Sequence, residues 1–407
     1  MTEDLIMAEL VHRGVTIHCP KSVYIAPDVD PSRISRDSVV LHPGTQIRGA
    51  DTLIGPGCVL GEEGPVTLDN AALGKRVHVK GGYVARSALL DDVTIGLGAQ
   101  VREGCIMEEQ TTLGHNVGIK QTILMPYVTL GSQINFCDAM MGGGTSRRDH
   151  SEVGSGFVHF NFTPIGTKAT ASMFGDVPRG VFLRQKRIFL GGMVGAVGPL
   201  KVGYGSVVGA GSMLRSDIGD DEFVLTSAHD EVRRAVTPSG QMKPAKVAAI
   251  IDHNLNYLAQ LRTLLMWYTS VRWVFCGRFR LGGLLNQQVQ GILVSTAAER
   301  IKRLRELAIV IDDAESRKPR KLPLRERVDA AIEALMQAEL PLDEGVIEDI
   351  TEPSLKRDAG YLDTMARLDD AVIAAGQAWL QSAVDACMTA ASQALGDLVA
   401  SDPGLRH

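Results

Sequence analysis

A histidine, an asparagine and a lysine stand close together in the stretch HFNFTPIGTKAT, residues 159–170. The imidazole of His159 changes its charge near neutral pH, so it could act as a general base. Asn161 can donate and accept hydrogen bonds, and Lys168 and the later Lys186 could hold a phosphate group. The stretch therefore predicts a site for an anionic ligand, with His159 as the first candidate for a base.

A second candidate region lies just upstream, in AMMGGGTSRRDHSE, residues 139–152. Three consecutive glycines do not fit a packed regular element, so we expect an extruded loop, and such loops carry function on rigid scaffolds. Arg147 could meet a phosphate or a carboxylate, and His150 is the second candidate for a base. The alternative is a solvated loop with ordinary surface charges. For His159 the alternative is a hydrogen-bonded residue at a coil edge, and for Lys186 an ordinary surface charge.

The chain around these candidates repeats every six residues. An α-helix would not keep this spacing, because its apolar face recurs about every 3.6 residues. A six-residue repeat predicts a parallel β-helix, in which three short strands close one coil of about 18 residues and the large apolar residue points inward. Glycines follow where the backbone must turn tightly. The large residues of the clearest run are Val77, Tyr83, Leu89, Ile95, Val101, Met107, Leu113, Ile119 and Met125.

The repeat has recognisable limits. We expect the β-helix over residues 11–236, with loop insertions near 139–152 and 160–190. Ile-Gly and Val-Gly pairs of the kind seen here are typical of left-handed coils. Beyond the β-helix the apolar spacing becomes helical, which predicts an α-helical domain over residues 244–400. The expected fold is thus mainly β plus α: a left-handed parallel β-helix followed by helices that cap its open end and contact neighbouring subunits.

Composition limits the possible partners and location. The 407 residues carry a formal net charge of -5 and 5% aromatic residues, so we expect no nucleic-acid partner. The six cysteines form no CxxC pair, which is typical of reduced thiols in a cytoplasmic protein. The N-terminus lacks a signal-peptide pattern, and the most apolar window, residues 264–277, is too short to span a membrane. We therefore predict a cytoplasmic protein without a membrane partner.

Two short segments carry a more specific signal than the hexads. The segment VGSGFVHFNF with its following hexads, and GHNVGIK at residues 114–120, resemble one family: the C-terminal β-helix of the bifunctional UDP-N-acetylglucosamine pyrophosphorylase/glucosamine-1-phosphate acetyltransferases. The resemblance covers roughly residues 55–218. It implies a left-handed β-helix, a homotrimer and a site between adjacent subunits. In that family the site transfers acetyl from acetyl-CoA to a sugar-phosphate amine. The family's nucleotidyltransferase domain is not expected in this chain.

The resemblance also implies roles for single residues. Lys120 matches a lysine that contacts the sugar phosphate. Asn161 matches the asparagine of an Asn-Tyr pair, with Phe162 in place of the tyrosine. Lys186 is matched to a later lysine, at a longer spacing than in the family.

The family's catalytic histidine should fall in the stretch INFCDA, where this chain has none. Asn135 and Asp138 occupy that stretch, and we place them among the substrate-binding residues. Asn135 cannot act as a base, and Asp138 would need a raised pKa to accept a proton from an ammonium group. His159 or His150 would then have to replace the missing base.

Two functions remain open from the sequence. The first is an acyltransferase acting on a sugar phosphate or a nucleotide sugar related to UDP-N-acetylglucosamine, with acetyl-CoA as donor and a histidine as base. The second is a non-catalytic sensor of sugar nucleotides or an assembly scaffold, favoured by the missing histidine and the long helical tail. A metal-dependent hexapeptide enzyme, such as a γ-class carbonic anhydrase, would need three histidines around one edge. The spacing of His78, His115 and His159 does not match that pattern, so we predict no metal site.

Overall fold

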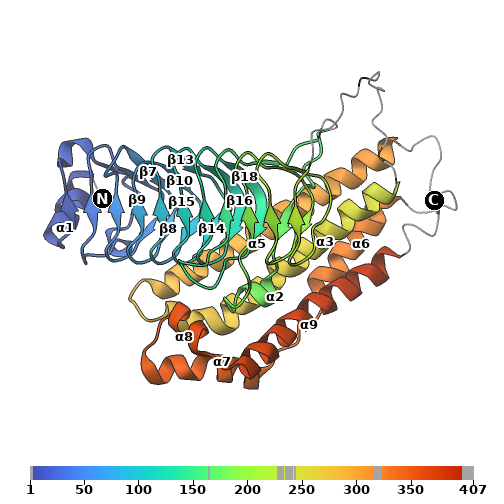
Figure 1. Cartoon of the computed structure of the whole chain (residues 1–407). Coiled ribbons are helices and arrows are strands. Elements are labelled where there is room, and N and C mark those ends of the chain that lie inside the picture. The colour runs from blue at the N-terminus through green and yellow to red at the C-terminus, as the bar shows by residue number, and fades with distance from the viewer. Residues whose placement is uncertain are drawn as a thin grey trace.

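The computed structural model describes residues 3–163, 166–226, 233, 242, 244–314 and 323–396. Short parallel strands stack into a long solenoid, and a group of helices lies along its side (Figure 1). The first helix, α1 (Glu3–His12), covers the N-terminal end of the solenoid. Its Ile6 and Leu10 are fully buried in the solenoid core, so this end is closed by a helix from the N-terminus rather than by the C-terminal helices.

The solenoid consists of two parallel sheets that wind around one apolar core. Within the described residues, the first sheet contains eleven strands, one from each coil. Its strands are β1 (Thr16–Ile17), β3 (Val40–Leu41), β6 (Val59–Leu60), β9 (His78–Val79), β12 (Thr94–Ile95), β15 (Thr112–Leu113), β17 (Thr129–Leu130), β19 (Glu152–Val153), β22 (Phe189–Leu190), β25 (Val207–Val208) and β27 (Phe223–Val224).

The second sheet, in the part of the chain that the structure describes, contains sixteen strands and bends around one corner of the solenoid. The long strands β16 and β18 each run through that corner, so they belong to both of its sides. Its strands are β2 (Tyr24–Ile25), β4 (Gln46–Arg48), β5 (Leu53–Ile54), β7 (Val66–Asp69), β8 (Ala72–Leu73), β10 (Gly82–Ala85), β11 (Ala88–Leu89), β13 (Ala99–Val101), β14 (Ile106–Met107), β16 (Gly118–Leu124), β18 (Asn135–Met141), β20 (Val158–Phe160), β21 (Ser172–Phe174), β23 (Gly195–Val197), β24 (Lys201–Val202) and β26 (Met213–Leu214).

The register confirms the predicted coil of three hexads. Thr94 pairs with Thr112, and Phe189 pairs with Val207, so each strand meets its counterpart one regular coil later. The coil between Thr129 and its partner Glu152 is longer, and the coil between Glu152 and its partner Phe189 is longer still. These two coils are those in which the sequence predicted insertions. The first coil, from Thr16 to its partner Val40, is also long, and no insertion was predicted there.

The first insertion begins later than expected, because residues 139–141 still belong to strand β18. The overall prediction of a hexapeptide-repeat left-handed β-helix followed by helices is confirmed.

Two residues of the predicted inward set point elsewhere. Tyr83 pairs in register with Gln100 and is only partly buried, while the next residue, Val84, is fully buried in the core. Met125 is buried against the helices and not inside the solenoid, where Leu124 lies instead. Both errors have the same cause. A coil shorter than three full hexads moves the inward-pointing position off the six-residue count. A shift of one residue turns a strand side chain to the opposite face of the sheet.

One outward-facing column of the solenoid is apolar. Its members follow each other in register through seven strands, and each stands just before an inward-pointing residue. All are at most 4% exposed and belong to the core of the helical region, so the helices cover this column. The members of this apolar column are Leu53, Ala72, Ala88, Ile106, Ile123, Met140 and Met173.

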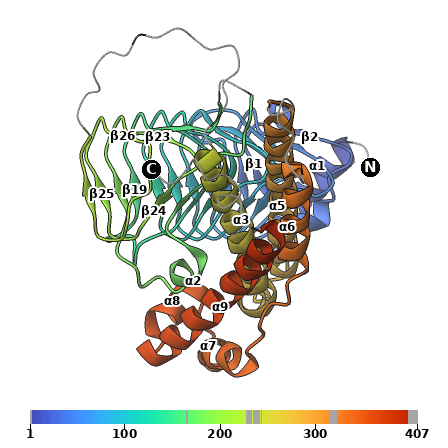
Figure 2. The ribbon, with the colours of Figure 1, turned by 90° about the vertical axis from the view of Figure 1, so that its right-hand side faces the viewer.

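The helices that cover the column run lengthwise along the solenoid (Figures 1 and 2). α5 contacts β8 and β11, and α3 contacts β21. The expectation that the helical region caps the open end is therefore corrected: it packs against the flank. The helical elements are α2 (Val177–Gly180), α3 (Pro244–Trp267), a π-helical turn η3 (Tyr268–Arg272), α4 (Trp273–Cys276), α5 (Gly282–Ala314), α6 (Leu324–Gln337), α7 (Glu344–Arg357), α8 (Tyr361–Arg367) and α9 (Asp370–Leu395), with short 3-10 turns η1 (Pro20–Ser22) and η2 (Pro31–Arg33) in the solenoid.

The domain limits 11–236 and 244–400 stay predictions, and residues 234–236 and 397–400 lie outside the described residues. None of the described helices is both long enough and apolar enough to cross a membrane.

A buried ionic cluster also joins the helices to the solenoid. Glu109 forms an ion pair of 2.5 Å with Arg272, and the hydroxyl of Tyr268 donates to Glu108 over 2.5 Å. The guanidinium of Arg272 is completely buried and lies 3.8 Å from the centre of the Tyr361 ring. A single buried cation can balance only one of the two carboxylates. Burial accordingly raises the pKa of Glu108 to about 7.

The Glu108 cluster predicts a pH dependence of stability. The folded-state pKa lies above the ordinary glutamate value, so the stabilisation is complete below about pH 4.5 and is lost as the pH rises through about 7. Glu108→Gln is permanently neutral and should lose less free energy of unfolding than the wild type between about pH 5 and pH 8, by roughly 2 kcal/mol. Urea denaturation across this pH range measures the difference, with the exposed Glu333→Gln in α6 as control. An unchanged pH profile in Glu108→Gln would contradict this assignment.

Candidate functional site

A small cavity of about 190 Å³ lies between the solenoid and α5, and we call it the Arg300 pocket. It brings together five of the residues that the sequence analysis selected. They come from β16, β18 and the segment after β20, so successive coils place them side by side on one corner of the solenoid. These residues are Lys120, Asn135, Asp138, Asn161 and Lys168.

The solenoid wall of the pocket is built by the strand register. Lys120 pairs with Cys137 of the next coil, and Arg102 follows Val101, which pairs with Ile119. The ammonium group of Lys120 contacts Glu103 at 2.6 Å, and Arg102 contacts the sulfur of Cys137 at 3.5 Å. Neighbouring coils thus present two cations toward the same cavity.

Asp138 stands at the centre of the site and is 7% exposed. Its backbone has a φ of 56°, the left-handed conformation that lets the strand turn at the corner. One carboxylate oxygen lies 2.5 Å from Arg300 of α5, and the other accepts a hydrogen bond of 2.5 Å from the amide of Asn161. The carboxylate is therefore held on both sides, which fixes the position of Arg300.

The helix wall consists of three residues from neighbouring turns of α5: Glu299, Arg300 and Arg303. Glu299 and Arg303 pair with each other at 2.6 Å. Arg300 is 2% exposed, and its Nε and Nη1 atoms have no hydrogen-bond partner among the described residues. A buried donor without a partner costs free energy of folding. The Nε and Nη1 atoms can therefore donate hydrogen bonds to an acceptor that a ligand brings.

The charges of the pocket favour an anion. Its lining contains five cationic side chains and two carboxylates. Both carboxylates are already paired, whereas Lys168 is exposed and makes no ion pair with any residue the structure describes. Phosphate and carboxylate groups are the ligands that such a set of lysine and arginine side chains recognises.

His159 does not reach this pocket. It lies in β20 with its side chain turned into the solenoid, and it is 1% exposed. Its Nδ1 lies 2.6 Å from the carbonyl of Cys137, so it donates there, and its Nε2 accepts from the hydroxyl of Ser172 at 2.7 Å. Burial lowers its pKa. The prediction of His159 as a general base is corrected, because both ring nitrogens are occupied inside the core.

The loop at residues 142–151 lies beside the other sheet, before β19. Arg147 donates to the carbonyls of Gln110 and Tyr127 at 3.0 and 2.9 Å, so it ties the loop to two earlier coils. His150 contacts the carbonyl of Arg147 at 2.9 Å and stands 3.6 Å from Glu152. Neither residue lines the Arg300 pocket, and their expected roles as phosphate contact and base have no support from this geometry.

Lys186 is also separate from the pocket. It is exposed before β22 and pairs with Asp221 at 2.8 Å. This agrees with the alternative interpretation of Lys186 as an ordinary surface charge. Among the described residues, no group of three His, Cys, Asp or Glu side chains is placed to hold a metal ion.

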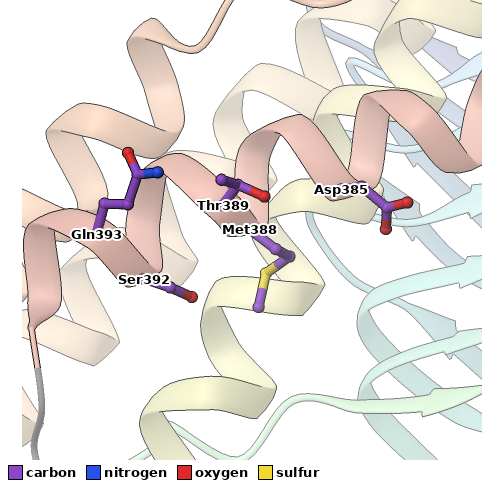
Figure 3. A pocket seen from close by; sticks show the side chains of 5 residues that line it. All are labelled: Asp385, Met388, Thr389, Ser392 and Gln393. Carbon is purple, nitrogen blue, oxygen red and sulfur yellow. The ribbon is translucent and has the colours of Figure 1, made fainter.

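Two further hollows lie among the described residues. A groove of about 890 Å³ continues from the Arg300 pocket along α5 and shares Lys120, Glu299 and Arg303 with it; we call it the α5 groove. The other is a shallow depression on the outside of α9, where exposed polar side chains surround Met388, which packs on the core (Figure 3). Its described lining residues include a single carboxylate, that of Asp385, and no cation, so they do not gather groups for chemistry.

Sequence reasoning missed the helix side of the site. Arg300 and Arg303 were not selected, because nothing in the hexads says that a helix much later in the chain lies over strand β18. Arg102, on the solenoid wall, was not selected either. One signal was available: in coil after coil the residue before the inward one is also apolar, as in Ile106-Met107 and Ile123-Leu124. Such a double apolar pattern indicates that the outer face is covered too.

Comparison with known proteins gives a partial match. No family model matches the chain. It is 30% identical over 226 residues to the bifunctional protein GlmU of Thermotoga petrophila, covering 55% of this chain and 45% of that protein. GlmU of Listeria monocytogenes is 28% identical over 221 residues, covering 54% and 43%. Among solved structures, a UDP-N-acetylglucosamine acyltransferase from Campylobacter jejuni aligns with a TM-score of 0.23 at 14% identity, covering 50% of this chain and 68% of that chain.

The chain thus spans less than half the length of the curated relatives it matches. The resemblance to GlmU that the two short segments indicated is confirmed, and it covers about half of this chain.

The buried position of His159 predicts that its loss affects folding. His159→Ala removes a ring and two hydrogen bonds from the core and should lower the free energy of unfolding by about 2–4 kcal/mol. His150→Ala, in the partly exposed loop, should lower the free energy of unfolding by less than about 1 kcal/mol. Urea denaturation of both variants measures this. Wild-type stability in His159→Ala, combined with a loss of ligand binding, would contradict the structural role.

Proposed function

We propose that this chain is an acyltransferase-like β-helix protein that binds a sugar phosphate or a nucleotide sugar in the Arg300 pocket. The observation that carries the proposal is the convergence of the family-matched Lys120 and Asn161 with Asn135, Lys168 and Arg300 around one cavity. These residues come from separate coils and from a helix far along the chain. Their meeting in one pocket supports a common ligand.

The chemistry of the lining suits such a ligand. Lys168, Arg102 and the free N–H groups of Arg300 would hold the phosphate. The amides of Asn135 and Asn161 would bind sugar hydroxyls, because an amide both donates and accepts. At about 190 Å³ the cavity is smaller than the roughly 300–1,000 Å³ of a site for a drug-sized molecule. It suits one sugar unit with its phosphate, and a larger ligand would have to extend into the α5 groove.

Acyl transfer from acetyl-CoA requires a base to accept the proton of the attacking amine. Among the described residues that line the pocket there is no histidine, and both oxygens of Asp138 are engaged. The residues present do not fit the transfer step, so acetyl-CoA remains the proposed donor without an assigned place, and we derive no step through it.

This geometry favours the second candidate function, a non-catalytic sensor or scaffold that recognises a sugar phosphate. The same binding pocket serves both candidates, so they differ only in whether a thioester is consumed. The helical region supplies three residues of the pocket within one chain. A homotrimer and a cytoplasmic location remain part of the proposal, and the binding site does not depend on either.

Binding of N-acetylglucosamine 1-phosphate tests the proposed site. Lys168→Met and Arg102→Met each remove a cation that the proposal places on the phosphate, so each should raise the dissociation constant about tenfold. Lys186→Met is the matched control, since this lysine pairs with Asp221 outside the pocket, and it should bind like the wild type. Isothermal titration calorimetry measures all three. If Lys186→Met lost affinity and the other two did not, the site would lie elsewhere.

A second measurement separates the two candidate functions. The protein is mixed with acetyl-CoA and glucosamine 1-phosphate, and release of free CoA thiol is followed. Binding without thiol release supports the sensor or scaffold, and thiol release that depends on the sugar phosphate supports the transferase.

A further inference from the structure

The α5 groove is open to a ligand that reaches beyond the Arg300 pocket. It runs along the corner of the solenoid, with outward side chains of the coils on one wall and α5 on the other. Because Lys120, Glu299 and Arg303 line both hollows, the two hollows adjoin each other.

The groove contains polar atoms that lack partners. Gln288 of α5 donates its Nε2 hydrogen to the carbonyl of Asp51, which fixes its Oε1 as an acceptor, and this oxygen has no partner among the described residues. Gln121 is 7% exposed, and its Oε1 is likewise buried without a partner. The amide of Gln121 lies over Gly104, where any Cβ would collide with it. Both glutamines line the groove from opposite walls.

These unpartnered acceptors restrict the chemistry of the ligand. A phosphate or carboxylate at neutral pH has no hydrogen to give them, so their partner must carry O–H or N–H groups. The Nε of Arg33, which is buried and unpartnered at the same groove, needs an acceptor. A sugar hydroxyl both donates and accepts, so a chain of hydroxyl groups satisfies all three residues.

The side chains around these atoms do not suit a nucleobase. Among the described residues that line the groove, none is aromatic, and aromatic stacking is the usual support for a base. Arg86 lies on the solenoid wall and Lys302 on the helix wall, and neither makes an ion pair within the described part of the chain. Their N–H groups are additional donors for hydroxyl and ring oxygens.

We infer that the α5 groove is an oligosaccharide-binding subsite, so that the ligand of this chain is a phosphorylated oligosaccharide. Its phosphate lies in the Arg300 pocket, and its further sugar units extend along α5 between Gln121 and Gln288. This inference rests on the proposed function, because the phosphate end is placed by the same pocket. It narrows that function to a sugar phosphate of more than one sugar unit, and it excludes the nucleotide sugar from the groove.

Calorimetry with three probes tests the subsite: N-acetylglucosamine 1-phosphate, N,N'-diacetylchitobiose 1-phosphate and UDP-N-acetylglucosamine. The disaccharide phosphate should bind at least about tenfold more tightly than the monosaccharide phosphate, because the second sugar meets the unpartnered amides. In Gln121→Leu and Gln288→Leu, the affinity gain of the disaccharide phosphate over the monosaccharide phosphate should fall below about threefold. The affinity for the monosaccharide phosphate should stay as in the wild type. Gln337→Leu, on the exposed face of α6, is the matched control and should keep the full gain.

The outcomes separate the two proposals. Equal affinity for the mono- and disaccharide phosphates would overturn the subsite and leave the proposed function standing. A tighter complex with UDP-N-acetylglucosamine that is weakened in both glutamine variants would also overturn it, since a nucleotide would then occupy the groove. Binding of none of the three probes would overturn the proposed function as well.

Discussion

The arrangement of this protein depends on the burial of one apolar column on the outside of the solenoid. From Leu53 to Met173, each coil places an apolar residue outward at the same register position. A fully buried leucine, isoleucine or methionine contributes about 1.5–3 kcal/mol relative to an exposed one, so a column of such residues strongly favours a covering layer. α3 and α5 form that layer, and their lengthwise direction follows from the column itself. Because α5 is fixed in this way, Arg300 comes to lie opposite Asp138.

The same packing explains how a binding site can form within one chain. The family resemblance placed the site between adjacent subunits, with one wall from each. Here α5 provides the second wall, and the pair of Asp138 and Arg300 joins the two walls of the pocket. A buried arginine with two unpartnered N–H groups is costly in an empty site, and an anionic ligand would supply the missing acceptors. This free-energy cost of the unpartnered N–H groups is consistent with a pocket whose role is ligand binding and not stability.

The fold could be predicted well from the sequence because the residue spacings that indicate it lie within short segments of the chain. The six-residue spacing fixes strand, turn and coil, and the change to helical spacing after residue 244 is equally local. Lys120, Asn135 and Asp138, which the sequence analysis selected as substrate-binding residues, lie on one corner because neighbouring coils stack in register. The prediction of His159 as a general base failed because its side chain points into the solenoid. The face to which a strand side chain points is reversed when the hexad count shifts by one residue. Arg300 could not be found, because its position depends on tertiary packing between segments that are distant in the chain.

The most direct test is a crystal structure of the full chain with N-acetylglucosamine 1-phosphate. We predict density for the phosphate between Lys168 and the free N–H groups of Arg300, with the sugar against Asn135 and Asn161 and α5 of the same chain closing the site. Density for the ligand at another corner of the solenoid, or a site closed by a neighbouring subunit with α5 displaced, would show that the helical region does not complete the pocket within one chain.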